Sequence, residues 1–198
     1  EDGEKAIELY KKAYLDNKSD SIIAVGGGIV TVDDGKGGRP EDYSYAVTRF
    51  FNKLPKPSEI GIEAAKRALN KIGQAKIESG KYTMLVENRS TARLISMLSN
   101  PLSARALQQK SSWLDGMMNK QIASEKLTII DDPFVSGGLA SRLYDGEGIA
   151  AKKRVIVEKG ILKEYYVDNY YGKKIGMEPN SGSSSNIFID FGTRNLDE

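Results

Sequence analysis

The sequence of 198 residues contains no histidine and no cysteine. Protein zinc sites draw their ligands from imidazole, thiolate and carboxylate groups, and catalytic zinc sites usually keep imidazole ligands and an open position for water. Carboxylates alone suit magnesium, calcium or manganese better than zinc. The same absences exclude Ser/His/Asp and Cys/His nucleophile arrangements, which need an imidazole base. The chemistry that remains would use Ser/Lys pairs, carboxylate pairs or backbone groups.

The chain also has little charge imbalance and no long apolar run. Its 29 basic and 27 acidic residues leave a net charge of +2, which is too small to indicate a surface that follows phosphates. We therefore expect no direct nucleic-acid partner. No apolar stretch approaches the length of a membrane span, so no membrane partner is expected either. The sequence begins at Glu1 and ends at Glu198 while still patterned, and we expect both ends to be cuts in a longer protein.

Helical periodicity follows four residues that can cap a helix. The predicted helices begin near Asp2, Ser58, Ser90 and Ser103. The first carries a stripe of Ala6, Leu9, Tyr10, Ala13 and Tyr14. The second is expected to bury Ile62, Ala65, Leu69 and Ile72, and the last extends as far as Met117. The cluster of Trp113, Met117 and Met118 is interpreted as core.

Runs rich in β-branched and aromatic residues predict the strands. The strongest signal is a hairpin in which Glu158-Lys159-Gly160 separates Val155–Val157 from Ile161–Val167. Further strands are predicted at Ser21–Val25, Ile29–Val32, Tyr82–Val86, Leu127–Ile130 and Ile187–Phe191. Residues 33–42 and 181–185 are predicted as loops, the second flexible and polar. Segregated helices and antiparallel hairpins indicate an α+β fold.

Two short motifs have competing interpretations. The run Gly26-Gly27-Gly28 could cradle a phosphate, but it lacks the Lys-Ser/Thr of a P-loop and the spacing of a dinucleotide site, so a turn between two strands is favoured. The run Lys152-Lys153-Arg154 could contact an anionic partner, although a solvated strand edge protected by charge is the preferred interpretation.

Four acidic residues are the candidates for a polar site. Asp131, Asp132, Asp145 and Glu147 could act as an acid–base pair or hold a hard cation, since carboxylates are the only strong ligands in the chain. Aspartates beside Pro133, Gly146 and Gly148 more often form Asx-turns, which is the favoured alternative.

The region from Pro101 to Met177 resembles the TldD/PmbA family, also called modulators of DNA gyrase, on its PmbA/TldE side. The resemblance rests on the order of ALQQKSSWL at Ala106–Leu114, KLTIIDDP at Lys126–Pro133, RLYDGEG at Arg142–Gly148, the hairpin and YGKKIGM. It implies part of a two-domain architecture. Residues 1–80 would be the C-terminal part of the N-terminal α/β domain, and residues 81–198 the first part of the β-rich C-terminal domain. The Val25–Gly38 region is expected to be shorter than in relatives.

Catalytic TldD-branch members place a His-Glu-x-x-x-His zinc motif on a helix that follows a strand. This chain reads VENRSTARL there, so Glu87, Asn88 and Ala92 mark the position of the lost motif. In such a motif the imidazoles bind zinc and the glutamate activates water. The resemblance therefore implies no catalytic residue, no metal ligand and no cofactor, although activity of the whole system is left open.

The resemblance implies a non-catalytic subunit of a cytoplasmic metalloprotease system. Its partner would be a TldD-like metalloprotease subunit or a second copy in a dimer, and its ligand a peptide or unfolded protein. The exposed strand edges beside the hairpin Val155–Val167 could accept such a peptide as an added strand. Two alternatives stay open: a divergent carboxylate peptidase that uses a hard metal, and a protein-binding regulator of DNA gyrase.

Overall fold

A computed structural model describes residues 24–190 of the chain. The chain divides into two compact units, Glu1–Tyr82 and Thr83–Glu198, which are described separately. The predicted helix that begins near Asp2, and most of the predicted strand Ser21–Val25, lie outside the described residues. Helices and antiparallel strands make up both units, so the α+β class is confirmed.

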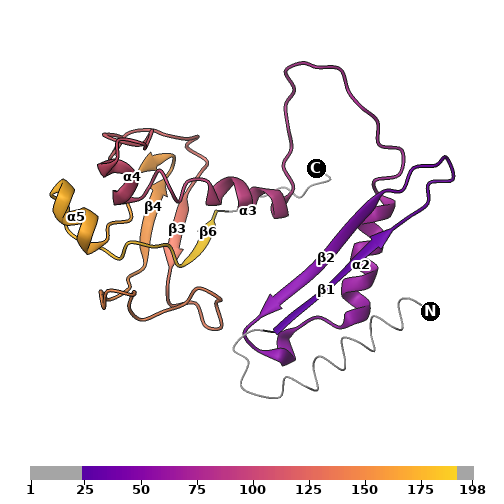
Figure 1. The fold of residues 1–198 in the computed structure, drawn as a ribbon, viewed down its shortest axis with the longest axis horizontal. Helices are drawn as coiled ribbons and strands as arrows, with labels where there is room; N and C mark the ends of the chain where they lie inside the picture. The colour runs from indigo at the N-terminus through magenta and orange to yellow at the C-terminus, as the bar shows by residue number, and fades with distance from the viewer. Residues whose placement is uncertain (1–23, 191–198) are drawn as a thin grey trace. The chain divides into compact units, whose positions relative to one another are not determined.

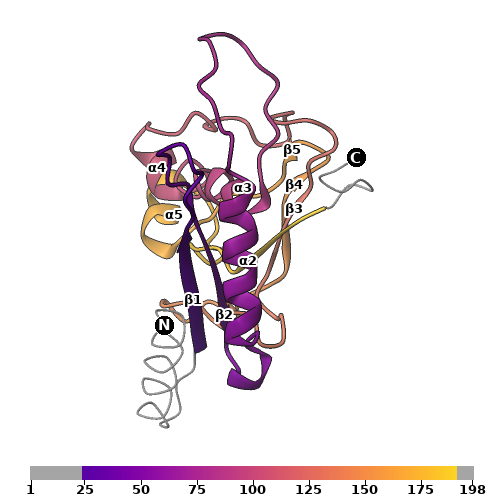
Figure 2. The ribbon, with the colours of Figure 1, turned by 90° about the vertical axis from the view of Figure 1, so that its right-hand side faces the viewer.

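The first unit is a β-hairpin covered by a helix. Strands β1 (Ala24–Thr31) and β2 (Glu41–Thr48) pair antiparallel, and helix α2 (Pro57–Leu69) lies along them in both views (Figures 1 and 2). The short 3-10 helix η1 (Phe51–Lys53) precedes α2. The predicted turn at Gly26–Gly28 is wrong, because the three glycines lie inside β1. The predicted loop 33–42 is shorter, since β2 already begins at Glu41.

Small residues explain how α2 approaches the hairpin. Gly26 lies opposite Ala46 and Gly28 opposite Ser44, and the helix buries Ile60, Ala64 and Ala68. A strand without large side chains on one face lets a helix with alanines on its surface come close. The prediction that Ile62, Leu69 and Ile72 are buried is therefore wrong, because the helix buries another face. Ile62 is 69% exposed, and Leu69 and Ile72 are exposed as well.

Residues 74–87, which join α2 to the next helix, form no helix or strand. The strand predicted at Tyr82–Val86 is therefore wrong. Its side chains are strongly exposed at Tyr82, Met84 and Leu85. A strand needs a neighbour to receive its backbone hydrogen bonds, and among the described residues no strand pairs with this segment.

The second unit contains a four-stranded antiparallel sheet with strand order β5-β4-β3-β6, of which Figure 1 labels β4, β3 and β6. Its elements, in chain order, are α3 (Asn88–Ser96), α4 (Ala104–Gln108), β3 (Ile129–Asp132), β4 (Arg154–Glu158), β5 (Ile161–Leu162), α5 (Asn169–Ile175) and β6 (Asn186–Ile189). The predicted hairpin is confirmed, with Lys159 and Gly160 at φ of 45° and 79° in its turn. Its second strand ends at Leu162, earlier than predicted.

The core of the second unit is aliphatic and aromatic. Its fully buried members come from α4, the segment after it, β4, β5 and the segment after β5: Ala104, Leu114, Ile156, Val157, Leu162 and Val167. Ser103 caps α4 as predicted, but the helix ends at Gln108 because Lys110 adopts a left-handed backbone with φ of 55°. Trp113 is 61% exposed, so its assignment to the core is wrong, whereas Met117 and Met118 do pack against the core.

Helix α5 is absent from the sequence-based prediction. Asp168 accepts a hydrogen bond from the backbone N–H of Tyr171 and caps its start, and Gly176 ends it in a left-handed conformation with φ of 72°. Within residues 24–190, every helix is too short or too polar to cross a bilayer.

Candidate functional site

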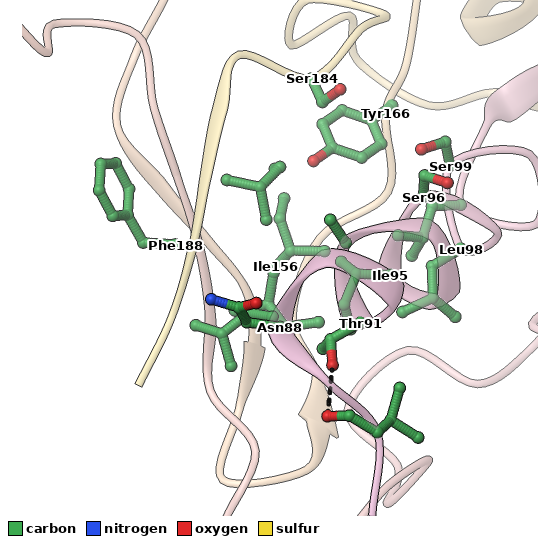
Figure 3. Close-up of a pocket in the computed structure, with 16 residues that line it drawn as sticks. Asn88, Thr91, Ile95, Ser96, Leu98, Ser99, Ile156, Tyr166, Ser184 and Phe188 are labelled. Carbon is green, nitrogen blue, oxygen red and sulfur yellow. Dashed lines mark hydrogen bonds between the residues drawn. The ribbon is translucent and has the colours of Figure 1, made fainter. Parts of the chain in front are cut away.

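The second unit contains an apolar cavity of about 630 Å³ between α3 and the sheet (Figure 3). Ile95 and Leu98 line it from the helical side, and Ile129 and Ile156 from the sheet. Strand β6 contributes Ile187, Phe188 and Ile189. In Figure 3, Phe188 points away from the other labelled side chains, as expected from the alternation of a strand.

Two of the residues expected at the position of the zinc motif lie at this cavity. Asn88 and Ala92 line it, and Glu87 is the residue immediately before α3. The Glu87 carboxylate accepts hydrogen bonds from the Arg89 guanidinium at 2.9 and 3.0 Å. The backbone carbonyl of Glu87 accepts one from Thr91 Oγ1 at 3.1 Å. The predicted helix is present, although it begins at Asn88 rather than Ser90.

The residues at this position do not fit a zinc ion. An amide and a methyl group stand at Asn88 and Ala92, and the whole chain offers no imidazole or thiolate. Among residues 24–190, no three carboxylates gather closely enough to hold another metal. The Glu87 carboxylate is engaged by a guanidinium instead.

The rim of the cavity carries uncharged polar groups. They are Asn88, Thr91, Ser96, Ser99, Tyr166 and Ser184. Burial raises the pKa of the Tyr166 phenol well above its ordinary value, and the nearby Asp131 carboxylate raises it further. The phenol is therefore a neutral hydrogen-bonding group at physiological pH. None of the 16 lining residues carries a charge.

A buried ion pair contacts Tyr166 and the loop that carries Ser184, both of which line the cavity. The guanidinium of Arg154 lies 3.2 Å from the Asp131 carboxylate, and both side chains are almost fully buried. Arg154 also donates to the carbonyls of Asn180, Ser181 and Ser183, and its guanidinium stacks 4.5 Å from the centre of the Tyr166 ring. The Asp131 carboxylate accepts a second hydrogen bond from the backbone N–H of Ser185 at 2.7 Å.

A second arginine holds the same loop. Arg142 donates to the carbonyls of Ser183 and Ser184 and to the hydroxyl of Ser181. Residues 181–185 form a polar loop as predicted, but Ser181 and Ser185 are buried, so the loop is packed against the unit rather than flexible. These contacts place Ser184 at the rim of the cavity and lead the chain into β6.

The predicted polar-site residues do not form one cluster. Asp131 pairs with Arg154, whereas Asp132 pairs with Lys153 at 3.0 Å. The backbone N–H of Phe134 and then Lys153 lower the pKa of Asp132. The prediction of a solvated edge at Lys152-Lys153-Arg154 is accordingly wrong for Arg154, which is buried.

Asp145 and Glu147 lie in a hydrogen-bonded turn. Asp145 Oδ1 accepts from the N–H groups of Glu147 and Ile149, both at 2.9 Å. Burial by itself would raise the pKa of Asp145, but these two hydrogen bonds outweigh it and lower the pKa. Glu147 accepts from the N–H of Asn169 at the start of α5. Gly148 has φ of 79°, as an Asx-turn of this kind favours.

The arginine pair and the cavity were missed by sequence reasoning. The burial of Arg154 could have been predicted. It lies two residues before the buried Ile156, and residues two apart in a strand face the same side of the sheet. No local signal existed for the cavity, whose walls come from segments about a hundred residues apart.

Comparisons with known proteins identify the family of the chain. The sequence profile of the PmbA/TldA metallopeptidase C-terminal domain matches residues 79–198. The chain belongs to the PmbA/TldD family. The PmbA metalloprotease homologue of Haemophilus influenzae is 31% identical over 84% of this chain and 36% of its own length. This chain thus spans about a third of the length of that curated relative.

Solved structures of the family share the fold. A Bacteroides thetaiotaomicron protein described as a modulator of DNA gyrase has a TM-score of 0.80 at 33% identity, covering 98% of this chain and 51% of its own. TldE from Thermococcus kodakarensis has a TM-score of 0.64 at 22% identity, covering 88% of this chain and 42% of its own, and shows the fold alone.

Proposed function

We propose that this PmbA/TldD-family chain is the non-catalytic, TldE-like part of a cytoplasmic metalloprotease system, which binds a TldD-like protease subunit and extended peptides. The observation that carries the proposal is the cavity beside α3. By the resemblance, Ala92 stands there in place of the second imidazole ligand and Asn88 in place of the glutamate that activates water, and the wall of the cavity is apolar. A site of this composition can hold part of a peptide but cannot activate water through a metal.

A strand edge beside the cavity, unpaired among residues 24–190, supports peptide binding. Strand β6 lies at one end of the sheet and pairs only with β3 among the described strands. An edge strand presents unpaired backbone N–H and C=O groups that can bind an extended peptide as an added strand. The edge beside the hairpin, which the sequence suggested for this role, is covered instead. There the backbone of Leu162 exchanges hydrogen bonds with Asn119 and Lys120.

The proposal predicts that the purified chain holds no stoichiometric zinc and does not cleave unfolded peptides alone. Elemental analysis and a peptidase assay measure both. Mixing with a histidine-bearing TldD-like subunit, followed by size-exclusion chromatography with light scattering, is expected to give a defined complex. About one zinc per chain together with intrinsic peptidase activity would contradict the proposal and support a divergent peptidase.

The name of the Bacteroides relative keeps one second candidate in view, a protein-binding regulator of DNA gyrase. The net charge of +2 does not suggest that such a role would involve direct DNA binding. The same chromatography with purified gyrase separates the two candidates. The proposed function predicts a complex with the TldD-like subunit and none with gyrase.

A further inference from the structure

We propose that the cavity beside α3 selects peptides with a bulky, uncharged apolar side chain, such as leucine or phenylalanine, at one position of an added strand along β6. This inference rests on the proposed peptide-binding function and specifies its ligand. The cavity wall combines Ile95 and Leu98 of the helical segment with Ile187 and Ile189 of the edge strand. An apolar side chain placed there would leave water for a surface of matching character.

The absence of charge in the lining provides the discrimination. No lysine, arginine, aspartate or glutamate is among the 16 lining residues. The nearest buried charges, Asp131 and Arg154, already satisfy each other. A charged side chain that entered the cavity would lose its hydration without gaining a partner, which is costly. The uncharged wall is therefore complementary to an uncharged side chain and rejects lysine and glutamate.

The geometry of β6 brings a peptide side chain to the cavity. Ile187 lies opposite Asp131 and Ile189 opposite Ile129 in the β3–β6 ladder, so both isoleucines share the cavity face of the sheet. Side chains of a strand alternate between the two faces, and every second residue of an added strand would face the same side as Ile187 and Ile189. A peptide paired with β6 consequently directs one side chain in two toward the cavity.

The size of the cavity suits this occupant. Its volume of about 630 Å³ lies within the range of roughly 300–1,000 Å³ that is typical of pockets for drug-sized ligands, so it has room for a leucine or phenylalanine side chain together with adjoining parts of the peptide. The hydroxyl and amide groups at the rim, including Asn88 and Ser184, can meet the polar backbone of the peptide where it leaves the edge strand.

A guest-residue series tests the inference. A fluorescent host peptide of serine and threonine residues carries leucine, phenylalanine, alanine, lysine or glutamate at its centre, and its binding to the chain and to the reconstituted complex is followed by anisotropy. We expect leucine and phenylalanine to bind roughly tenfold or more tightly than alanine. Lysine and glutamate should bind no better than alanine.

Two variants at one exposed position of α3 locate the effect. Ala92→Phe fills the cavity and should remove the preference for leucine, whereas Ser90→Phe on the same helix, outside the cavity, should leave it unchanged. Ala92→Glu places a carboxylate at the wall and should make lysine the preferred guest over glutamate. Circular dichroism confirms that each variant is folded.

The outcomes separate this inference from the proposed function. Equal binding of all guests, or a leucine preference that survives Ala92→Phe, would overturn the selectivity and leave peptide binding intact. No binding to the chain or to the complex would overturn both. Self-association that Ala92→Phe abolishes would show that a second copy covers the cavity, and would also overturn the selectivity.

Discussion

The two units of the chain bury their apolar residues in different ways. The first unit packs α2 onto β1 and β2 through small side chains such as Ala64 and Ala68, and leaves Val25, Ile29 and Tyr45 exposed. The second unit closes around large aliphatic residues and a buried ion pair. Because hydrophobic stabilisation scales with the apolar area removed from water, the second unit should supply most of the folding free energy.

Removing the buried arginine should have the largest effect. Arg154→Leu leaves the Asp131 carboxylate buried without its partner and releases the serine loop, and about 3–5 kcal/mol of unfolding free energy should be lost. Denaturant titration measures the change. The matched control is Lys153→Leu, which breaks an ion pair whose lysine is 60% exposed and should cost about 0–1 kcal/mol. Equal effects of the two variants would contradict the structural role of Arg154.

Truncating apolar side chains compares the two units directly. Leu162→Ala in the second unit opens a cavity around a fully buried side chain and should cost about 2–5 kcal/mol. Ile62→Ala, on the exposed face of α2, should change the unfolding free energy by no more than about 0.5 kcal/mol. Thermal unfolding of both variants tests the contrast. A comparable loss from Ile62→Ala would mean that this face is covered in solution.

The two glycines in the turn that contains Asp145 should differ in their effect on stability, by less than the two preceding pairs of variants. Gly148→Ala forces an alanine into a backbone with φ of 79° and should cost about 1 kcal/mol. Gly146 has no positive φ, and a methyl group added there would meet open space, so Gly146→Ala should be close to neutral. Chemical unfolding distinguishes them. If Glu147→Gln instead abolished peptide handling in a reconstituted complex at unchanged stability, the turn would belong to a functional site.

The smallest expected effect is a pH dependence at the same turn. The pKa of Asp145 is lowered in the folded protein from its ordinary 3.8, because hydrogen bonds favour the carboxylate over the cost of burial. A lowered folded-state pKa contributes stability above pH 3.8 that is lost as the pH falls through the folded value. Asp145→Asn should therefore flatten the acid end of the stability profile, as measured by melting temperature below about pH 4. An unchanged acid slope would contradict this assignment.

Local signals in the sequence predicted local structure well. The hairpin around Lys159 and Gly160, the cap at Ser103 and the helix at the lost motif were all accessible, since each depends on neighbouring residues. The family and its α+β fold were also accessible, through the order of short motifs.

Features that depend on distant partners were not predicted. Gly26–Gly28 resembled a turn because nothing local reveals that α2 needs small residues beneath it. The serine loop resembled a flexible segment because its two anchors, Arg142 and Arg154, lie more than 25 residues away. The cavity was not predicted either, apart from Asn88 and Ala92, because only tertiary packing brings α3 beside β6.

We have proposed that this chain binds peptides for a metalloprotease without catalysing their cleavage. Its most direct test is the hydrolysis of an unfolded peptide by the chain, by a histidine-bearing TldD-like subunit, and by their mixture. We expect no cleavage by the chain alone and faster cleavage by the mixture than by the subunit, and we expect Ala92→Phe to raise KM while kcat is kept. Zinc-dependent cleavage by the chain alone, or a mixture no more active than the subunit, would contradict it.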